Sequence, residues 1–465
     1  MERAEVAVVG GGPAGASAGE AAAAAGADTV IFEKGVPRED REGPGPDSTD
    51  AAGFLDYWVD LAGLDPTEIP DGVIHRPLEG AEFVGPSERV SFSGRTGMGG
   101  GYPHFGFTFH RAQFDDWLRG RAEDAGAEYR VGTAVDEVDP DPSGEAHRLV
   151  LADGREVAAG YLVLADGPQR PVTLPTLDTL LPDGRSAADH LGPTSANHIA
   201  YQEYRRFPEE VFEPRTLRFW WGWMPGHTAY PWVFPNDGRV ARVGLTMPID
   251  LDLDDVSDPD AYRLLRADDD RIPQGSVYVR RLLAEAYPEY DPEDFPRVED
   301  RGKAGGTETY PISSTRPVDS PVGAGVAVVG GAMGATSAFH EGGDHLAIRT
   351  GRLAGRLAAE GRLDEYNGAW KDAVGDEVLR NAALATTVEG FGPDEWDRTF
   401  ATANRLQSAT PGLGPRLRHL PSWLRAAGRT GLVLGATYRW RRFRLAGDYV
   451  RIAEDEYAYG RTGPG

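Results

Sequence analysis

The sequence contains no cysteine. Its absence excludes disulfide bonds, thiolate nucleophiles, Cys-x-x-Cys redox pairs, thiolate-bound iron–sulfur clusters and cysteine-ligated zinc sites. Any redox chemistry would therefore have to be carried by a bound cofactor. We predict no metal site.

Lysine is also scarce: the 465 residues contain only Lys34, Lys303 and Lys371, so arginine supplies 45 of the 48 basic residues. With 73 acidic residues, the net charge is −25. The acidic residues are spread along the chain, which favours a halophilic protein whose carboxylates keep its surface hydrated. The alternative is an acidic surface that binds a basic partner. Nucleic-acid binding is disfavoured, because phosphates would be repelled.

Long apolar runs and a signal peptide are absent as well. No run approaches the length of a membrane-spanning helix, and the N-terminal Met-Glu-Arg-Ala-Glu lacks the basic and apolar regions of a signal peptide. We therefore expect a cytoplasmic protein. A chain of this length can bury a large core, and we expect two or three structural units.

The most informative motif lies near the N-terminus. Residues 6–9 are typical of a buried parallel strand, and Gly10, Gly12 and Gly15 follow with the spacing G-x-G-x-x-G. The first glycine permits a tight turn, the second lets the backbone approach a pyrophosphate, and the third lets the next helix lie close to the strand. Residues 14–25 are mostly strong helix formers, and the N-terminus of such a helix attracts phosphate.

A second apolar run, residues 28–33, ends at Glu33, where a carboxylate would bind a ribose diol. Strand, glycines, helix, strand and acid in this order predict a dinucleotide site. The alternative is a glycine-rich turn in an ordinary α/β domain.

The rest of the chain contains further predicted helices and strands. Composition and periodicity predict a loop at 35–50 and helices at 51–61, from His110 onward and at 345–359. They also predict strands within 73–110 and at 131–138, 148–151, 161–165, 219–223, 230–235 and 326–329. Residues 376–465 are predicted to be helical.

The C-terminal region reverses the charge of the chain. Between Pro411 and Arg451 there are nine arginines and one acid, Asp448, interleaved with aromatic and aliphatic residues. This pattern resembles a basic amphipathic surface for anionic lipid, which would make the protein peripheral to the membrane. The alternative is that these arginines pair with the protein's own acidic surface, and high salt would weaken both effects.

Three separated elements together resemble a known fold. They are the segment from Gly10 to Glu33, the turn Ala165-Asp-Gly-Pro168, and Gly330-Gly-Ala332 followed by the glycine-flanked residues 342–351. In this order they resemble flavoproteins of the p-hydroxybenzoate-hydroxylase-like fold. More narrowly, the chain resembles the archaeal geranylgeranyl reductases, whose Tyr-x-Trp-x-Phe-Pro motif is matched by Tyr230-Pro-Trp-Val-Phe-Pro235.

The resemblance implies an α/β fold with an α+β insert and FAD as cofactor. It divides the chain into a discontinuous FAD-binding domain of the Rossmann-like β-α-β type, an inserted antiparallel-sheet substrate domain, and a helical C-terminal region. The FAD-binding domain comprises 1–72, 105–190 and 301–370, the substrate domain 73–104 and 191–300, and the C-terminal region 371–465.

The resemblance also implies site residues. Gly10, Gly12, Ala14, Gly15 and Glu33 would bind the ADP half of FAD, Arg111 opens a neighbouring helix, and Val135 lies where a backbone amide meets adenine. The remaining cofactor positions are the second turn and the start of the last helix, which faces the O2 side of the flavin and would stabilise the anionic reduced form. They are Asp166, Gly167, Gly331, Gly343 and Asp344.

Two positions depart from the family pattern. At Gly331 the family usually has an aspartate that contacts the ribityl or pyrophosphate region, so one hydrogen bond to the cofactor is lost. Residues 43–48 stand where many of these reductases have a cysteine near the flavin, and this chain has none.

By resemblance, the reaction is saturation of a polyprenyl C=C bond by hydride from reduced FAD and a proton from a second group. Trp221, Tyr230, Trp232 and Phe234, with Trp220 and Trp223, are candidate walls for an isoprenoid; the alternative is that strand aromatics form core. His340 is the first candidate for the proton source, with Tyr230 as a second catalytic residue. Glu341, His104 and Tyr102 are further candidates, and a histidine satisfied by a backbone carbonyl is the alternative for His340.

Electrons would come from NAD(P)H or a ferredoxin, and no second glycine fingerprint decides between them. Competing functions are an electron-transfer flavoprotein:quinone-type dehydrogenase, an FAD-dependent monooxygenase, and a relative that binds flavin or lipid without catalysis. A flavin-dependent halogenase needs a lysine in the first substrate-facing region. None occurs between Lys34 and Lys303, which excludes that function.

Overall fold

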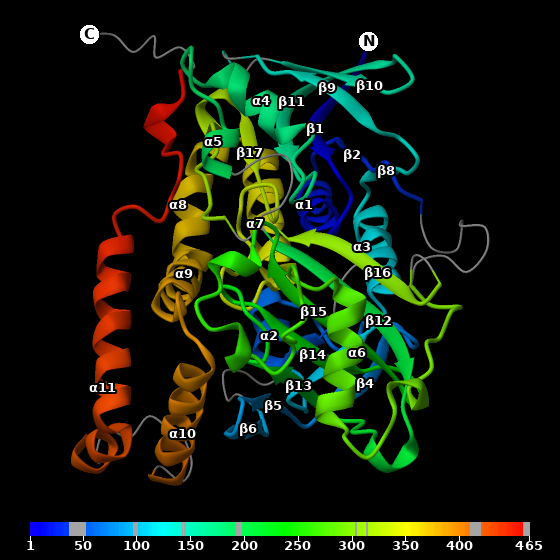
Figure 1. Ribbon diagram of the computed structural model, residues 1–465. Helices are drawn as coiled ribbons and strands as arrows, with labels where there is room; N and C mark the ends of the chain where they lie inside the picture. Colours follow the sequence, from blue (N-terminus) through cyan, green and yellow to red (C-terminus); the bar gives the residue numbers. More distant parts are fainter. Residues whose placement is uncertain are drawn as a thin grey trace.

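The computed structural model describes residues 1–36, 53–95, 101–141, 143, 146–191, 198–302, 305–312, 315–409 and 420–458. Residues 43–48, where the family cysteine is missing, lie outside the described residues. The described part contains two seven-stranded sheets and one three-stranded sheet, with helices packed around them (Figure 1).

The first sheet carries the N-terminal motif. Its strand order is β8-β2-β1-β11-β10-β9, and β17 pairs with the end of β11 beside β10. Strand β1 is parallel to β2 and β11, and its apolar half is buried, as expected of a parallel strand covered on both faces. The strands are β1 (Glu2–Val9), β2 (Thr29–Phe32), β8 (Glu128–Arg130), β9 (Val135–Asp139), β10 (His147–Leu151), β11 (Glu156–Leu164) and β17 (Val326–Val328).

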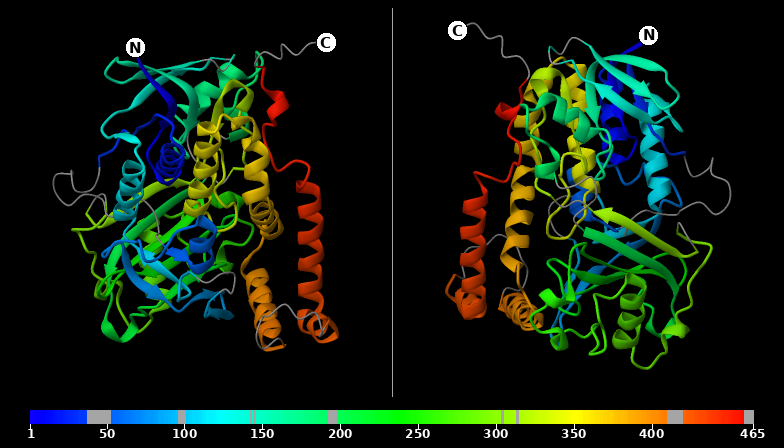
Figure 2. Two further views of the ribbon diagram at one scale, coloured as in Figure 1. Left: turned by 180° about the vertical axis from the view of Figure 1, so that it is seen from behind. Right: turned by 45° about the horizontal axis from the view of Figure 1, so that its top comes forward.

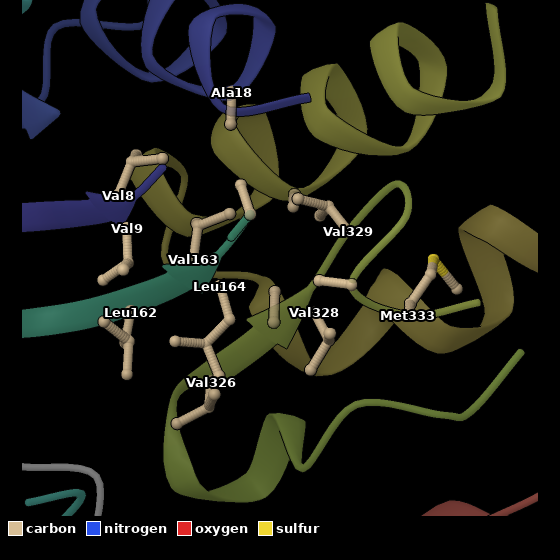
Figure 3. Close-up of a cluster of buried hydrophobic side chains, with 14 of the residues drawn as sticks. Val8, Val9, Ala18, Leu162, Val163, Leu164, Val326, Val328, Val329 and Met333 are labelled. Atoms are coloured by element: carbon tan, nitrogen blue, oxygen red, sulfur yellow. The ribbon is translucent and has the colours of Figure 1, made fainter. Parts of the chain in front are cut away.

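Helices α1 (Pro13–Ala24) and α7 (Asp344–Ala359) pack side by side against this sheet, and valines and leucines of β1, β11 and β17 fill the core (Figure 3). Two glycines of α7 bring the helices into backbone contact. A Cβ atom on Gly351 would lie 2.1 Å from the carbonyl oxygen of Ala14, and one on Gly355 would lie 1.9 Å from that of Ala18. No side chain fits between the helices at these two positions.

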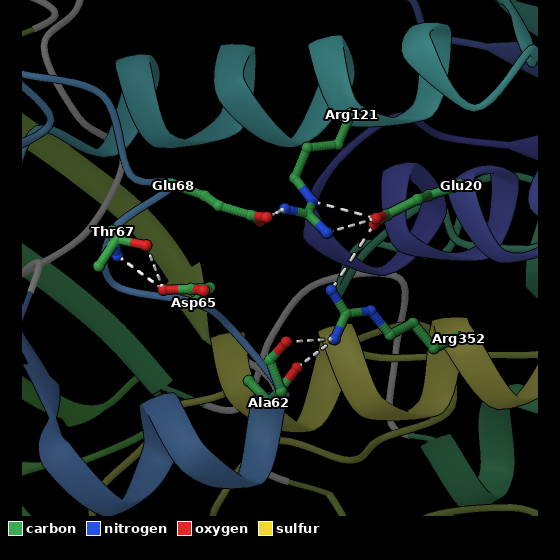
Figure 4. Close-up of polar contacts among 8 residues, drawn as sticks. Glu20, Ala62, Asp65, Thr67, Glu68, Arg121 and Arg352 are labelled. Carbon is green, nitrogen blue, oxygen red and sulfur yellow. Dashed lines mark hydrogen bonds and ion pairs between the residues drawn. The ribbon is translucent and has the colours of Figure 1, made fainter. Parts of the chain in front are cut away.

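A charged cluster links the helices α1, α3 and α7 (Figure 4). Glu20 of α1 accepts hydrogen bonds of 3.0 and 2.6 Å from Arg121 of α3 (Arg111–Asp124) and forms an ion pair of 3.6 Å with Arg352 of α7. Arg352 also donates to the carbonyl oxygen of Ala62 at the end of α2 (Asp56–Ala62). These shared partners fix the mutual positions of α1, α2, α3 and α7. Two short helices, α4 (Thr173–Leu180) and α5 (Ala188–Leu191), follow β11.

The second sheet has the order β16-β12-β15-β14-β13-β5-β6 and is antiparallel except where β5 pairs with β13. Helix α6 (Gly275–Ala286) covers one of its faces. Strand β16 pairs with β12 in this sheet, although it lies within the 301–370 segment that the predicted division gives to the first domain. The strands are β5 (Gly80–Val84), β6 (Arg89–Ser93), β12 (His198–Arg206), β13 (Thr216–Trp220), β14 (Tyr230–Pro235), β15 (Val240–Pro248) and β16 (Thr307–Ile312).

The third sheet joins β3 (Gly53–Leu55), β7 (Gly106–Phe109) and β4 (Ile74–Leu78). The predicted helix at 51–61 is therefore wrong at its start. Residues 53–55 pair with β7 as a strand, and the helix begins only at Asp56. Phe54 stacks on Phe107 of β7, and this cross-strand contact favours the extended conformation.

The C-terminal region is helical, as the sequence predicts, as far as Leu445, whereas the described residues from 446 to 458 form turns and a single 3₁₀ turn. Glu377 of α9 joins this region to α7, since its carboxylate is 2.7 Å from Nε2 of His345 and 3.1 Å from Arg349. The helices are α8 (Tyr366–Trp370), a π-helical turn Lys371–Gly375, α9 (Asp376–Val388), α10 (Pro393–Ala409) and α11 (Leu420–Leu445), which is kinked at Gly428, where φ is 57°. Short 3₁₀ turns elsewhere are Glu209–Val211, Leu253–Asp255, Pro259–Ala261, Pro292–Asp294, Val322–Ala324, Leu363–Glu365 and Glu454–Glu456.

We predict that Gly355→Ala destabilises the protein by about 1–3 kcal/mol, because the new methyl group would collide with the backbone of α1 at Ala18. Thermal unfolding followed by circular dichroism measures the effect. Gly368→Ala in α8 is the matched control, since a Cβ atom there meets nothing within 4 Å. Equal melting temperatures for the two variants would contradict the close contact of α1 and α7.

Candidate functional site

Three glycine turns from distant parts of the chain meet at the N-terminus of α1. Gly10 has a φ of 97°, and a Cβ atom on it would lie 2.4 Å from the carbonyl oxygen of Ala165, in the second turn. Gly330 has a φ of 58°, and its Cβ atom would lie 2.8 Å from that of Ala14. Gly331 in turn lies against Pro168. The structure thus brings together the three elements that the sequence predicts to form one site.

The space in front of these turns is open. Cβ atoms placed on Gly12 and Gly167 would meet nothing within 4 Å. Gly12 is the N-cap of α1, no side chain caps this helix, and Pro13 occupies its first turn. The backbone N–H groups of the first turn of α1 therefore face a region that can accept an anion.

Glu33 lies beside the first turn, as predicted. Its carboxylate accepts hydrogen bonds of 2.6 Å from the backbone N–H groups of Gly11 and Gly35. A carboxylate has about four lone pairs, so both oxygens retain capacity for a diol. The backbone N–H of Thr133 donates to the carbonyl oxygen of Glu33 at 2.8 Å, which places the segment leading to Val135 next to this acid.

Asp166 is engaged by its own domain. Its carboxylate accepts hydrogen bonds from the backbone N–H groups of Val172 and Thr173, at 2.7 and 2.9 Å, and from the Thr173 hydroxyl. Burial raises the pKa of this carboxyl group, and the hydrogen bonds oppose the shift. Asp166 thereby fixes the second turn to the start of α4.

Arg170 is a residue that the sequence reasoning missed. Its side chain is fully buried, its φ is 54°, and its guanidinium donates to the carbonyl oxygens of Gly331, Ala332 and Leu191 at 3.1, 2.8 and 3.1 Å. Burial lowers its pKa to about 10, so it stays charged at neutral pH. It therefore places a positive charge directly behind the turn that contains Gly331.

The predicted residues at the start of α7 also meet. Gly343 is the N-cap of α7 without a side-chain cap, and Asp344 occupies the first turn. Arg111, the first residue of α3, lies 3.4 Å from the Asp344 carboxylate and donates a 2.8 Å hydrogen bond to Asp115. An uncapped helix N-terminus with an adjacent arginine suits a ligand that carries partial negative charge.

These features fit a dinucleotide such as FAD. Open space lies before Gly12 and Gly167, uncapped N-termini of α1 and α7 face the same group of turns, and an acid stands at the end of β2. The donor set consists of backbone N–H groups and one arginine, which suits a pyrophosphate and a flavin ring better than a metal ion.

The loop before α7 holds the predicted catalytic histidine. The His340 ring stacks on Trp58 of α2 with ring centroids 5.4 Å apart, and its Nδ1 accepts a 3.2 Å hydrogen bond from the N–H of Gly342. Burial, together with the nearby His345, lowers the pKa of His340 to about 4. The ring is therefore neutral at neutral pH.

Glu341 extends from the same loop to the second sheet. Its carboxylate accepts from the hydroxyl of Thr246 on β15 and lies 3.4 Å from both the Thr228 hydroxyl and Nε2 of His198. The side chain is 2% exposed, and burial raises its pKa. Glu341 is thus a buried acid where the loop before α7 meets the second sheet.

Backbone strain is concentrated in the same region. Among the described residues, those with positive φ other than glycine are Arg170, Thr228 and Glu341, with φ between 53° and 58°. Each such residue costs of order 1–3 kcal/mol and persists only where the surrounding structure holds it. All three contact the turns or the loop described above, which supports a functional origin of the strain.

The predicted aromatic wall separates into two faces of the second sheet. Trp221 stacks on Tyr230 with centroids 4.5 Å apart, and the Tyr230 hydroxyl donates a 2.8 Å hydrogen bond to the carbonyl oxygen of His340. Trp232 and Phe234 follow on the same face of β14. Trp220 and Trp223 belong instead to the buried cluster beneath α6, apart from the other four aromatic residues.

The remaining candidates lie elsewhere. Tyr102 packs on Phe107 of the third sheet, and His104 contacts Tyr102. The residues that sequence reasoning missed were Arg170, Trp58, Trp396 and the pair His345–Glu377. Trp396 of α10 contacts Trp221 with centroids 4.5 Å apart. These contacts join positions far apart in the sequence, and no motif marks them.

No protein-family model matches the chain. It is 28% identical to digeranylgeranylglycerophospholipid reductase 2 of Methanopyrus kandleri, over 80% of this chain and 83% of the relative. It is 25% identical to menaquinone reductase of Mycolicibacterium smegmatis, over 84% of this chain and 86% of the relative. A geranylgeranyl bacteriochlorophyll reductase-like protein from Thermoplasma acidophilum has the same fold, with a TM-score of 0.67, 20% identity and coverage of 95% of this chain and 100% of the other.

The relatives are reductases that this chain matches over most of their length, and the solved structure shares the fold. The chain is therefore similar over most of its length to the geranylgeranyl reductases, and this similarity identifies it as a flavoprotein oxidoreductase.

Proposed function

We propose that this protein reduces C=C bonds in geranylgeranyl or polyprenyl chains of membrane lipids or quinones. The observation that carries the proposal is the likeness to reductases named for a digeranylgeranyl phospholipid and for menaquinone, which extends over at least 80% of this chain. Both named substrates are isoprenoid, so we propose the isoprenoid chain as the group that is recognised. A quinone substrate would also agree with the alternative of a quinone-type dehydrogenase.

We propose that Gly10, Gly12, Ala14, Gly15 and Glu33 hold the ADP half of FAD. The other proposed contacts are Arg111, Val135, Asp166, Gly167, Gly331, Gly343 and Asp344. FAD, when bound and reduced, would supply the hydride for the alkene. The N-terminus of α7 would stabilise negative charge at the ring edge, since its N–H groups lack a side-chain cap. The physiological electron donor is proposed to be NAD(P)H or a ferredoxin.

We propose that Trp221, Tyr230, Trp232 and Phe234 line the path of the isoprenoid. All four are buried on the face of the second sheet that Phe339, from the loop before α7, also contacts. An apolar wall excludes water and holds the alkene in one orientation, which lowers the barrier for an unactivated double bond.

Proton addition to the second alkene carbon requires an acid near this wall. The sequence favours His340, but its ring is neutral at neutral pH, and a neutral imidazole releases a proton poorly. We propose that Glu341 holds the proton, because burial keeps its carboxyl group protonated to higher pH. Tyr230 and His340 would act in catalysis by holding this loop, through the hydrogen bond from the Tyr230 hydroxyl to the His340 carbonyl.

Anaerobic incubation of the reduced, FAD-loaded protein with geranylgeranylated lipids or polyprenyl quinones tests the function. We expect mass spectrometry to detect products with added pairs of hydrogens. Flavin reoxidation by other acceptors without any mass change in an isoprenoid would contradict the proposal. A phenol that stimulates NAD(P)H oxidation would favour a monooxygenase instead.

Gly12→Ala is expected to weaken FAD binding by about tenfold or more, because the methyl group would occupy the space in which a pyrophosphate contacts backbone N–H groups. Stability without FAD should stay within about 0.5 kcal/mol of the parent, since that methyl group meets no protein atom. Fluorescence titration and thermal unfolding measure the two effects. Gly120→Ala, equally open but on α3, is the control and should change neither.

Glu341→Gln is expected to lower the single-turnover rate of alkene reduction by about 10²–10⁴-fold, the usual contribution of a general acid. Because the pKa of Glu341 is raised, the parent should be fully active below that pKa and lose activity as pH rises through it. The glutamine variant should lack this alkaline limb. Tyr230→Phe and His340→Ala should keep this loss of activity at high pH and should retain FAD. If Glu341→Gln still loses activity at high pH as the parent does, another acid donates the proton.

A further inference from the structure

Helix α11 presents an apolar face to solvent. Leu432, Val433, Trp440 and Phe443 are 48, 57, 51 and 81% exposed, and they make up four of the nine exposed large hydrophobic residues in the described part of the chain. Val433, Trp440 and Phe443 follow one another at intervals of seven and three residues, and Leu432 lies eleven residues, about three helical turns, before Phe443, so the four share one side of the helix. Single exposed apolar residues are common on proteins, whereas a contiguous group marks an interaction surface.

The opposite side of α11 holds the helix to the protein. A Cβ atom on Gly431 would lie 3.0 Å from a methyl carbon of Thr402 on α10, and Arg442 forms an ion pair with Asp376 at the start of α9. Figures 1 and 2 show α11 at the outer edge of the molecule in every view, beyond α9 and α10. The apolar face therefore points away from the body.

This face also carries positive charge. The sequence from residue 420 to 445 contains six arginines and no acid, within a chain of net charge −25. Arg429, Arg439 and Arg444 are exposed on the outward side. Arg441 and Arg444 lie over the Trp440 ring, 5.2 and 5.0 Å from its centroid, so charge and aromatic surface form one patch.

We propose that the outer face of α11 binds the surface of an anionic lipid bilayer, with the helix lying in the plane of the interface. Arginines beside tryptophan and phenylalanine on one helix face are the arrangement that suits the headgroup region, where rings enter the acyl boundary and guanidinium groups contact phosphates. No helix in the described ranges is long and apolar enough to cross a membrane, α11 included.

The outer face of α11 is connected through α10 to the aromatic wall of the proposed substrate path. Helix α10, which packs beside α11, places Trp396 against Trp221, and Trp221 stacks on Tyr230. Trp396 also contacts Phe400 and Phe391. A prenyl chain that leaves the bilayer beside α10 and α11 would contact these aromatic side chains before it reaches the loop of Glu341. This step rests on the proposed function, whereas the binding of α11 to lipid does not.

The combination of arginines and apolar side chains on the outward face of α11 favours a bilayer over protein partners. An acidic electron carrier would use the arginines but would leave four large apolar side chains in water. A second copy that docked through its own α11 would bury the apolar residues but would place the arginines of the two copies against each other. A bilayer with anionic headgroups uses both sets of side chains.

The test is co-flotation of the FAD-loaded full-length protein with phosphatidylcholine vesicles that contain or lack phosphatidylglycerol. We expect binding to anionic vesicles that weakens as the salt concentration rises. The apolar side chains should retain part of the binding at high salt. The variants Trp440→Ser/Phe443→Ser and Arg439→Glu/Arg444→Glu should each bind at least about tenfold more weakly, since each basic residue near such a surface contributes about fivefold.

Ile249→Ser/Arg271→Glu, at exposed positions away from α11, is the matched control and should bind like the parent. Equal binding of all variants, or a self-association of the parent that only the α11 variants lose, would overturn the docking surface. Alkene reduction in detergent separates the two proposals. Its retention in variants that no longer bind vesicles supports the docking surface, and its absence in the parent despite vesicle binding refutes the reductase function alone.

Discussion

The backbone contact between α1 and α7 is the constraint on which the site depends. Ala14 and Ala18 touch α7 where Gly351 and Gly355 leave no side chain in the way. Because α1 starts at the first glycine turn and α7 starts after the loop of Glu341, this contact sets the distance between the two helix N-termini. Any side chain between the helices would separate the dinucleotide turn from the loop. Gly351 and Gly355 therefore matter as much for the geometry of the site as the glycines of the turn before α1.

A second consequence concerns strain. Glu341 lies between Tyr230, which holds the carbonyl of its neighbour His340, and the start of α7, which is fixed by α1. With both ends held, the backbone at Glu341 takes a φ of 58°, and its carboxylate reaches Thr246. The hydrogen bonds to threonines offset part of the cost of burying this acid. The first domain thus delivers an acid into the second sheet without contributing a strand to it.

The sequence predicts those parts of the fold that local rules determine. The spacing of Gly10, Gly12 and Gly15, the apolar strands and the helical tail follow from periodicity and from glycine's conformational freedom. The start of α2 was predicted wrongly because Phe54 pairs across strands with Phe107, and a contact between distant residues overrides helix propensity. The meeting of the three glycine turns was predicted from their motifs. Arg170 and the neutral state of His340 could not be predicted, because burial and partners from several segments determine them.

Arg170 also bears on the loss of aspartate at Gly331. An aspartate in that turn would offer one hydrogen bond to the cofactor and a negative charge near its phosphates. Here the turn is bare, and a buried guanidinium donates to its carbonyl oxygens from behind. In a buried region a charge acts over several ångströms with little screening, so the guanidinium of Arg170 would favour the two negative charges of a pyrophosphate bound in front of this turn. At the proposed FAD site, the field of Arg170 and the backbone N–H groups at the N-terminus of α1 would supply affinity that the bare turn at Gly331 does not.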